Sequence, residues 1–459
     1  MANRLDSGLA TLLASVTDGR TENVRYRQNE LFRLHTGLKE KSDEIRLSIS
    51  QTTLSNSKDA ETEFFLGMDA LRLAYEELDF EKAIKDEYLV ANGADNPTRR
   101  VGLGLVAIRP AEHSRFYSII SPLASAISAG NCVLLELKAA QSPLDELLSS
   151  ILSALLDQET FFVSTTTLKI DDIASVNYVV DQTASTASGS SRTVALIDRS
   201  ADLDQAAKSI VAARLFSNGA SPYAPYLVLV NDFVSEAFRQ SCFKYAKTLR
   251  ADQVRGQPKN ELPQYIQEAK SEGQIKTHSS VPGFTIIEIK DPSFEPLKSK
   301  LNGPYITTLT SSGLVSSVSS LRNEPTFLAT YIFSSPKAAK FLSEQIASHV
   351  SYINQIPSRL LVGPASLPAH PHQLHPRYTT EMFSQPRPQV IEQVKDSEIS
   401  TEIKDLRPTG QRPGHAVGFF EQGIFLGLGI TAFVILPSLG YGIFRIGREA
   451  WRFALKSSA

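Results

Sequence analysis

The chain has 459 residues, and 42% of them are hydrophobic. A chain of this length is longer than one hydrophobic core usually serves, so two or more packed units are expected. Lys+Arg (47) and Asp+Glu (49) nearly balance, and without a long basic block the chain is not expected to bind nucleic acid. Its two cysteines, Cys132 and Cys242, cannot supply a disulfide framework for a protein this large, which indicates a reducing compartment.

The first half of the chain alternates predicted helices and strands. Apolar residues recur at helical spacing in residues 24–49 and 60–84, which predicts two amphipathic helices. A strand in "VGLGLVAIRP" (residues 101–110), a helix in "FYSIISPLASAISAG" and a strand in "NCVLLEL" follow, and this order predicts a parallel sheet with helices on its faces. Strands at residues 193–198 and 226–230 and in "ATYIFSS" continue the alternation, so the predicted fold is α/β.

The C-terminal part of the chain has a different character. Residues 389–416 are rich in charge and proline, which predicts a tethering linker. Residues 423–444 contain no charge, and as a helix they span roughly 33 Å, enough for a hydrocarbon core of about 30 Å. The tail at residues 445–459 carries Arg445, Arg448, Trp451, Arg452 and Lys456. Because basic and aromatic residues anchor a span at its interface, a transmembrane helix is favoured over a buried core helix.

Several stretches carry a family resemblance, and they occur in the family's order. They are "TDGRTENVRYRQNELFRLHTGLKEKSDEI", "SPLASAISAGNCVLLELK", "LIDRSADLDQAAKSI", "APYLVLV", "LNGPYI", "FLATYIFSS" and "FSQPRP". Together they resemble the aldehyde dehydrogenase superfamily, in particular its class 3-like, fatty-aldehyde branch, which also has a C-terminal membrane anchor. The resemblance implies a Rossmann-type parallel-sheet domain that binds a dinucleotide, together with an α/β catalytic-type domain.

In this family a cysteine thiolate attacks the aldehyde, hydride passes to NAD(P), and a glutamate acts as general base in hydrolysis of the thioester. The family's loop is N-x-G-Q-x-C-x-AP, and placing it on Gly219, Ala224 and Pro225 puts Pro222 at the nucleophile position. Proline has no nucleophilic atom. The adjacent Ser221 needs a general base, and the sequence shows none nearby, so no catalytic residue is predicted.

The resemblance also locates the oxyanion and cofactor positions. The oxyanion asparagine falls on His113, and the preceding Glu112 disfavours a developing negative charge. The lysine that meets the adenosine ribose becomes Glu136, and the glutamate that holds the nicotinamide ribose becomes Lys300. The phenylalanine of the FGP turn becomes Asn302. The replacement at Glu136 reverses the charge beside a phosphate-bearing ligand.

Residues 173–193 are too short for what the family has there: a strand, a GS-x-x-x-G turn, a helix, and the ELGG segment with the general base. They lack roughly twenty residues, since a helix, a turn and a strand seldom fit in so few. The gap is either a true deletion or an error in the gene model that skipped an exon. No cofactor is therefore expected, and NAD(P) is expected only if the protein is active.

A histidine-containing stretch, "AHPHQLHP", suggests a different chemistry. The spacing of His370, His372 and His375 could recruit a metal, but no carboxylate or cysteine completes the set. A solvent-exposed loop is therefore favoured, and no metal site is predicted.

The sequence thus predicts a domain order and two functional hypotheses. The order is an N-terminal helical and degenerate dinucleotide-binding domain (1–192), a catalytic-type and dimerisation domain (193–388), the linker, the span and the basic tail. The first hypothesis is a membrane-anchored, catalytically impaired pseudoenzyme with a binding or scaffolding role. It would form a homodimer, or a heterodimer with an active relative. The alternative is an active NAD(P)-dependent oxidoreductase acting on a hydrophobic aldehyde. The body is expected in the cytosol. The anchor is expected in the membrane of the endoplasmic reticulum, the mitochondrial outer membrane or the peroxisome.

Overall fold

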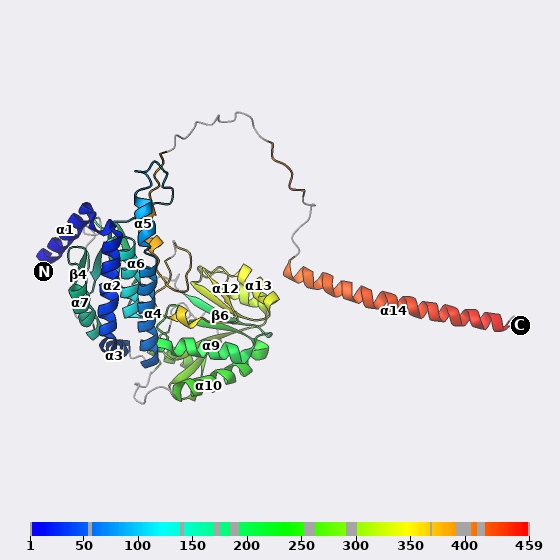
Figure 1. Cartoon of the computed structure of the whole chain (residues 1–459). Helices are drawn as coiled ribbons and strands as arrows, with labels where there is room; N and C mark the ends of the chain where they lie inside the picture. Colours follow the sequence, from blue (N-terminus) through cyan, green and yellow to red (C-terminus); the bar gives the residue numbers. More distant parts are fainter. Residues whose placement is uncertain are drawn as a thin grey trace. The chain divides into compact units, whose positions relative to one another are not determined.

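The computed structural model describes residues 2–53, 57–137, 142–168, 175–183, 192–251, 262–290, 301–367, 370–391, 405–410 and 418–457. It divides into two compact units, Met1–Gln393 and Val394–Ala459. Figure 1 shows the helices and strands of both.

Five helices open the first unit: α1 (Ala2–Asp18), α2 (Val24–Glu40), α3 (Ser42–Thr53), α4 (Ser57–Glu76) and α5 (Phe80–Glu87). The predicted helix over residues 24–49 is therefore two helices, because Lys41 leaves the helical conformation (φ −95°, ψ 14°) while its N–H still bonds to Gly37. The helix predicted over residues 60–84 is likewise divided, since Asp79 caps a new helix by accepting from the N–H of Lys82.

The first sheet has four parallel strands in the order β4-β3-β2-β5. They are β2 (Leu105–Arg109), β3 (Cys132–Glu136), β4 (Phe161–Ser164) and β5 (Tyr178–Asp181). Helix α6 (Arg115–Ser128) connects β2 to β3, and α7 (Pro143–Leu155) connects β3 to β4. The βαβ unit predicted from the sequence is thus present.

Each face of this sheet is covered by helices, so its strands are buried. Val106 and Val133 pack on one face in a core with α2, α4 and α6, which lie side by side in Figure 1. Leu105 and Leu134 pack on the other face against Leu12 of α1. Burial on both faces explains why β2 and β3 read as continuous apolar runs rather than alternating ones.

The second sheet has seven strands in the order β12-β11-β6-β7-β10-β9-β8, all parallel except for the β8–β9 pair. They are β6 (Thr193–Ile197), β7 (Leu227–Asn231), β8 (Ile275–Val281), β9 (Phe284–Ile289), β10 (Tyr305–Ser311), β11 (Ala329–Phe333) and β12 (Ser351–Ile353). The helices are α9 (Leu203–Leu215), α10 (Ser235–Ala251), α11 (Gln264–Ser271), α12 (Leu314–Leu321) and α13 (Pro336–Gln345).

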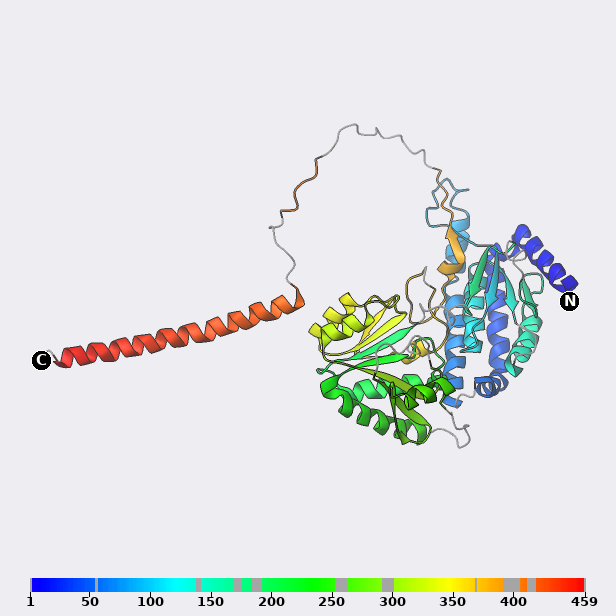
Figure 2. The same ribbon diagram turned by 180° about the vertical axis from the view of Figure 1, so that it is seen from behind.

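These helices cover opposite faces of the seven-stranded sheet, as Figure 2 shows. Helices α9 and α10 pack on the face that carries Ala195 and Val228. Helices α11, α12 and α13 pack on the face that carries Val194 and Leu227. The strands are sandwiched between two helical layers, as in other doubly covered parallel sheets.

After the second sheet, the chain returns to pair with a strand of its first half in a separate two-stranded sheet. Strand β13 (Ser384–Pro386) pairs antiparallel with β1 (Arg100–Gly102). The side chain of Asn131 donates to the carbonyl of Phe383 (3.0 Å), and Ser125 Oγ donates to the carbonyl of Tyr378 (3.1 Å). Residues 378–386 are therefore joined to residues 100–131, a segment far from them in the sequence.

In the second unit, helix α14 (Phe419–Ser457) covers the charge-free run and much of the basic tail. Within the described part of the chain, no helix, α14 included, has the length and apolar character needed to cross a membrane. The transmembrane helix predicted for residues 423–444 is therefore not confirmed.

Candidate functional site

The loop before β7 is the position that the sequence assigns to the nucleophile. It follows α9 through a short 3₁₀ turn, Phe216–Gly219, in which Ser217 (φ 43°), Asn218 (φ 53°) and Gly219 (φ 70°) are all left-handed. A Cβ on Gly219 would lie 2.9 Å from the carbonyl oxygen of Gly303, so only glycine fits there. Asp59 of α4 accepts a hydrogen bond from the N–H of Ser217 (3.0 Å).

The turn in "LNGPYI" lies directly against this loop. The N–H of Gly303 donates to the carbonyl of Asn218 (2.8 Å). Arg214, with 2% of its surface exposed, donates to the carbonyls of Tyr305 (2.7 Å) and Gly303 (3.0 Å). Burial lowers the pKa of Arg214 to about 10. A buried arginine and backbone hydrogen bonds thus hold together the two segments that the resemblance assigns to the nucleophile and to the nicotinamide ribose.

The residues at the nucleophile position cannot act as nucleophiles. Pro222 is buried, and its carbonyl lies 3.4 Å from Thr193 Oγ1, which donates to it. Ser221 has no exposed surface. A carbonyl carbon could not reach either residue without displacing the loop.

The two cysteines do not replace the missing thiol. Both Cys132, on β3, and Cys242, on α10, are fully buried. Burial raises the pKa of Cys132 to about 12 and raises that of Cys242 well above the ordinary range. Because the thiolate is the nucleophilic form, neither residue supplies it near neutral pH.

His113, at the predicted oxyanion position, is hydrogen-bonded to the backbone. Its Nε2 lies 2.9 Å from the carbonyl oxygen of Leu361 and 2.9 Å from Ser114 Oγ. A carbonyl oxygen only accepts, so Nε2 carries the proton and donates it to the backbone. The neighbouring Glu112 is exposed. This imidazole N–H therefore fixes a loop rather than meeting an oxyanion.

Glu136, at the predicted cofactor position, ends β3 at the carboxyl edge of the four-stranded sheet. It is 6% exposed, and its Oε2 accepts from Arg109 Nε (3.0 Å) at the end of β2. Arg109 also donates to Asp181 Oδ2 (3.3 Å) at the end of β5. Burial works against the charge of Arg109, but the bonds to Glu136 and Asp181 outweigh it, and its pKa is raised.

This edge is where open α/β sheets bind nucleotides. The three strand ends carry one guanidinium against two carboxylates, and the guanidinium is already bonded to both. A dinucleotide brings further negative charge. The residues present therefore do not fit NAD(P) at this edge.

The connection from β5 to β6 is short, with eleven residues between the two strands. Strand β5 ends at Asp181 and β6 begins at Thr193, and the described residues between them, 182, 183 and 192, form no helix. Residues 184–191, which include Gly189, lie outside the described residues, as do Lys138 and Lys300. Of the elements that the family has in residues 173–193, a strand is present, as β5.

The histidine-containing stretch is not the solvent-exposed loop that the sequence favoured. His375 has only 5% of its side chain exposed, and its Nε2 lies 3.0 Å from Asp69 Oδ2. His372 is half-buried and hydrogen-bonded to Tyr352 and Ser366. Both imidazoles form hydrogen bonds with side chains from distant elements, Tyr352 and Asp69, and the local sequence could not reveal these contacts. The described residues contain no group of three or more His, Cys, Asp or Glu able to hold a metal.

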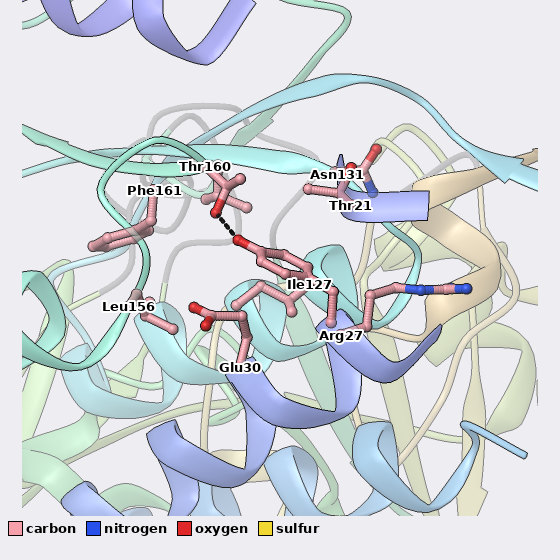
Figure 3. A pocket seen from close by; sticks show the side chains of 10 residues that line it. Thr21, Arg27, Glu30, Ile127, Asn131, Leu156, Thr160 and Phe161 are labelled. Carbon is pink, nitrogen blue, oxygen red and sulfur yellow. Dashed lines mark hydrogen bonds between the residues drawn. The ribbon is translucent and has the colours of Figure 1, made fainter. Parts of the chain in front are cut away.

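Figure 3 shows a cavity of about 10 Å³, room for about one water molecule. Tyr26, Thr160 and Asn131 are among the residues that line it, and the hydroxyl groups of Tyr26 and Thr160 are 2.7 Å apart. Thr160 and Asn131 immediately precede β4 and β3. The cavity therefore lies at the amino edge of the sheet, opposite the edge where a nucleotide would bind.

No protein-family model matches the chain, and no curated protein matches it. Solved structures do resemble it. An aldehyde dehydrogenase of Staphylococcus aureus in its substrate-bound state has a TM-score of 0.66 and 15% identity, covering 93% of this chain and 99% of that one. An NAD-dependent benzaldehyde dehydrogenase of Corynebacterium glutamicum has a TM-score of 0.59 and 15% identity. The match covers 86% of this chain and 90% of that one.

A mutant of aldehyde dehydrogenase C from Pseudomonas syringae, in complex with NAD+ and octanal, has a TM-score of 0.60 and 17% identity. It covers 78% of this chain and 82% of that one. Identities this low establish the fold alone. The predicted α/β architecture with parallel sheets is confirmed: the chain has the fold of the aldehyde dehydrogenases.

Proposed function

We propose that the chain is a degenerate relative of the class 3-like, fatty-aldehyde branch that no longer oxidises aldehydes and serves as a binding or scaffolding protein. One observation carries the proposal: the loop before β7 keeps its buried framework of Arg214, Gly219 and Gly303, yet holds Pro222 where the chemistry needs a thiolate. The framework stabilises the fold and contributes no reacting atom.

The carboxyl edge of the four-stranded sheet supports the same proposal. Glu136 and Asp181 neutralise Arg109, so no cation remains in this trio to hold a pyrophosphate. No binding of NAD(P) is therefore expected.

The competing function is an NAD(P)-dependent oxidoreductase for a hydrophobic aldehyde. It is favoured by the similarity in fold to a solved enzyme that holds NAD+ and octanal. Such an enzyme would need a nucleophile other than a cysteine, because both cysteines are fully buried.

Nucleotide binding separates the two functions. The full-length protein is titrated with NADH and with NADPH while nucleotide fluorescence is followed, beside a Glu136→Gln variant in which the edge carries one negative charge fewer. The proposal predicts no saturable binding to the wild-type protein. Saturable micromolar binding would favour the oxidoreductase.

The partners follow from the same relationship. We propose that the protein forms a homodimer, or a heterodimer with an active relative. Light scattering after gel filtration gives the mass of the purified protein. Co-expression with an active aldehyde dehydrogenase from the same source tests the mixed dimer. A strict monomer in both experiments would rule out these partners.

We further propose that residues 423–444 anchor the protein to a membrane, with the body in the cytosol. The support is their freedom from charge and the basic and aromatic residues that follow. The protein is expected to stay in the membrane pellet after alkaline carbonate extraction, and a variant ending at residue 416 to be released. Co-staining with markers assigns the endoplasmic reticulum, mitochondrial outer membrane or peroxisome. Release of the full-length protein would refute the anchor.

A further inference from the structure

A serine and a histidine meet near the end of the second sheet. Ser366 follows the short 3₁₀ helix Ser358–Leu361, and its Oγ lies 3.1 Å from Nδ1 of His372. Nε2 of the same imidazole lies 2.9 Å from the hydroxyl of Tyr352 on β12. A hydroxyl on one ring nitrogen and an orienting group on the other is the arrangement that activates serine nucleophiles.

The surrounding hydrogen bonds orient the serine proton. Arg377 Nη1 lies 3.1 Å from Ser366 Oγ and can only donate to it. The hydroxyl of Tyr223 accepts from the N–H of Ser366 (3.0 Å) and lies 2.8 Å from its Oγ. With Arg377 as a donor, and Tyr223 free to donate its own proton, the remaining direction for the serine proton is toward His372 Nδ1. An alkoxide at Oγ would face the guanidinium, the phenol and the imidazolium.

The supporting groups are buried, whereas the reacting pair reaches solvent. Tyr223 is fully buried and Arg377 is 3% exposed; the guanidinium lies 4.6 Å from the centre of the Tyr223 ring. Arg377 also donates to the carbonyl of Leu360 (3.2 Å). Ser366 and His372 are half-buried. Buried supporting groups that hold a half-buried serine and histidine in place are what preorganised catalysis requires.

The imidazole is unprotonated at neutral pH. Burial, and next the charge of Arg377, lower the pKa of His372 to about 4. His372 is then neutral above about pH 5 and is a weaker base than an ordinary histidine, so the hydrogen bond from Ser366 and the charge of Arg377 beside Oγ have to favour the proton transfer.

We propose that Ser366 and His372 form a nucleophile–base pair that hydrolyses small acyl esters. Ser366 Oγ attacks the acyl carbon and passes its proton to His372 Nδ1. The bond from the acyl carbon to the leaving oxygen breaks, and His372 gives the proton to that oxygen. Water then attacks the acyl-serine carbon and gives a proton to His372, and the carbon–Oγ bond breaks as the proton returns to Oγ. One ester and one water yield one acid and one alcohol.

This activity needs no nucleotide and does not depend on the proposed function. Pro222 precedes Tyr223, so the pair lies next to the loop that lacks the thiol, but it uses different atoms. A scaffold that binds no NAD(P) and an active oxidoreductase could each carry it.

Two measurements on the full-length protein test the proposal. The first is labelling with a fluorophosphonate probe, with the modified residue mapped by peptide mass spectrometry. The proposal predicts label on Ser366 of the folded wild-type protein. Absence of label on Ser366 would overturn it, and this reading needs no variant to fold.

The second is the hydrolysis of p-nitrophenyl acetate. Ser366→Ala is expected to lose the enzymatic rate, and His372→Gln to lower it by about 100-fold, the usual contribution of a general base. Ser343→Ala, which alters a half-buried serine on α13 away from the pair, is the matched control and should match wild type. The wild-type rate should not fall between pH 7.5 and 5.5, as it would with an unperturbed histidine. Equal rates for wild type and Ser366→Ala would also overturn the proposal.

Discussion

At the scale of single residues, Glu63 shows how burial creates a pH-sensitive group. It lies on α4, 3% exposed, and its Oε1 accepts from the N–H groups of Phe116 (2.8 Å) and Tyr117 (3.3 Å) at the start of α6. Ser114, which precedes α6, makes no capping hydrogen bond with its side chain. Glu63 therefore caps this helix from another element.

Burial raises the pKa of Glu63 from 4.5 to about 7, although its two backbone hydrogen bonds act in the opposite direction. The folded protein thus binds this proton more tightly than the unfolded chain. The contribution of Glu63 to the free energy of unfolding is largest below about pH 4.5 and is lost as the pH rises through 7.

Glu63→Gln keeps the acceptor oxygen and removes the titration. We expect the variant to be more stable than wild type at pH 8, and this advantage to shrink toward pH 4.5. The change amounts to roughly 3 kcal/mol, at about 1.4 kcal/mol per pKa unit. Urea unfolding across this pH range measures it. Glu61→Gln, an exposed residue of the same helix, is the control, and parallel stability curves for Glu63→Gln and wild type would contradict the account.

Pro222→Cys tests whether the missing thiol alone explains the proposed loss of activity. The new thiol would be buried like the proline, and the carboxyl edge would still repel a nucleotide. We expect no aldehyde-dependent reduction of NAD or NADP, and slow reaction of the new thiol with a disulfide reagent. Recovery of aldehyde oxidation by this one change would show that the cofactor site is intact.

At the scale of elements, the ends of β3, β2 and β5 act together. Parallel strands bring their carboxyl ends to one edge, so Glu136, Arg109 and Asp181 become neighbours although they are far apart in sequence. In this position they join three strands by ion pairs across the edge. The trio stabilises the edge, and in the proposed function its only cation, Arg109, is paired with carboxylates and not with a phosphate.

Glu136→Lys restores the charge that the family has at this position, and we expect it to destabilise the protein. Two cations would face each other at a poorly solvated edge, and breaking such a pair costs roughly 3 kcal/mol. Glu136→Gln keeps a hydrogen bond to Arg109 and should cost less. Urea unfolding of both variants gives the comparison. A Glu136→Lys protein as stable as wild type would mean that the ion pair is dispensable.

Several elements were predictable from sequence because their signals are local. Strands β2, β3, β6, β7 and β11 lie in apolar runs buried on both faces. Strand β8 was not predicted, since "IKTHSSV" is an edge strand with largely exposed side chains. The break at Lys41 was missed because the apolar spacing continues through it.

The site was less predictable than the fold, because its contacts join distant segments. The resemblance located Pro222 and Glu136, but spacing alone did not reveal that Arg109 neutralises Glu136. Nor could it show that Arg377 and His372 meet at Ser366. In "AHPHQLHP" the sequence favoured an exposed loop, whereas the His375 side chain is buried beside Asp69 and His372 is half-buried beside Tyr352.

At the scale of the whole molecule, the described residues have the fold of the aldehyde dehydrogenases, and the proposed function rests on Pro222 at the position that the resemblance assigns to the nucleophile. Two sheets with helices on both faces, together with strand β13, give the fold of the aldehyde dehydrogenases. The similarity to one such structure covers 93% of the chain. A binding or dimer surface of the kind proposed would need this fold, because such a surface depends on packing and not on a reacting thiol.

The most direct test is the turnover of octanal by the full-length protein with NAD or NADP, followed by absorbance of the reduced coenzyme, beside an active aldehyde dehydrogenase. The account predicts that the active enzyme reduces coenzyme while this protein does not exceed the rate without protein. Reduction of one coenzyme per aldehyde consumed, dependent on this chain, would contradict it.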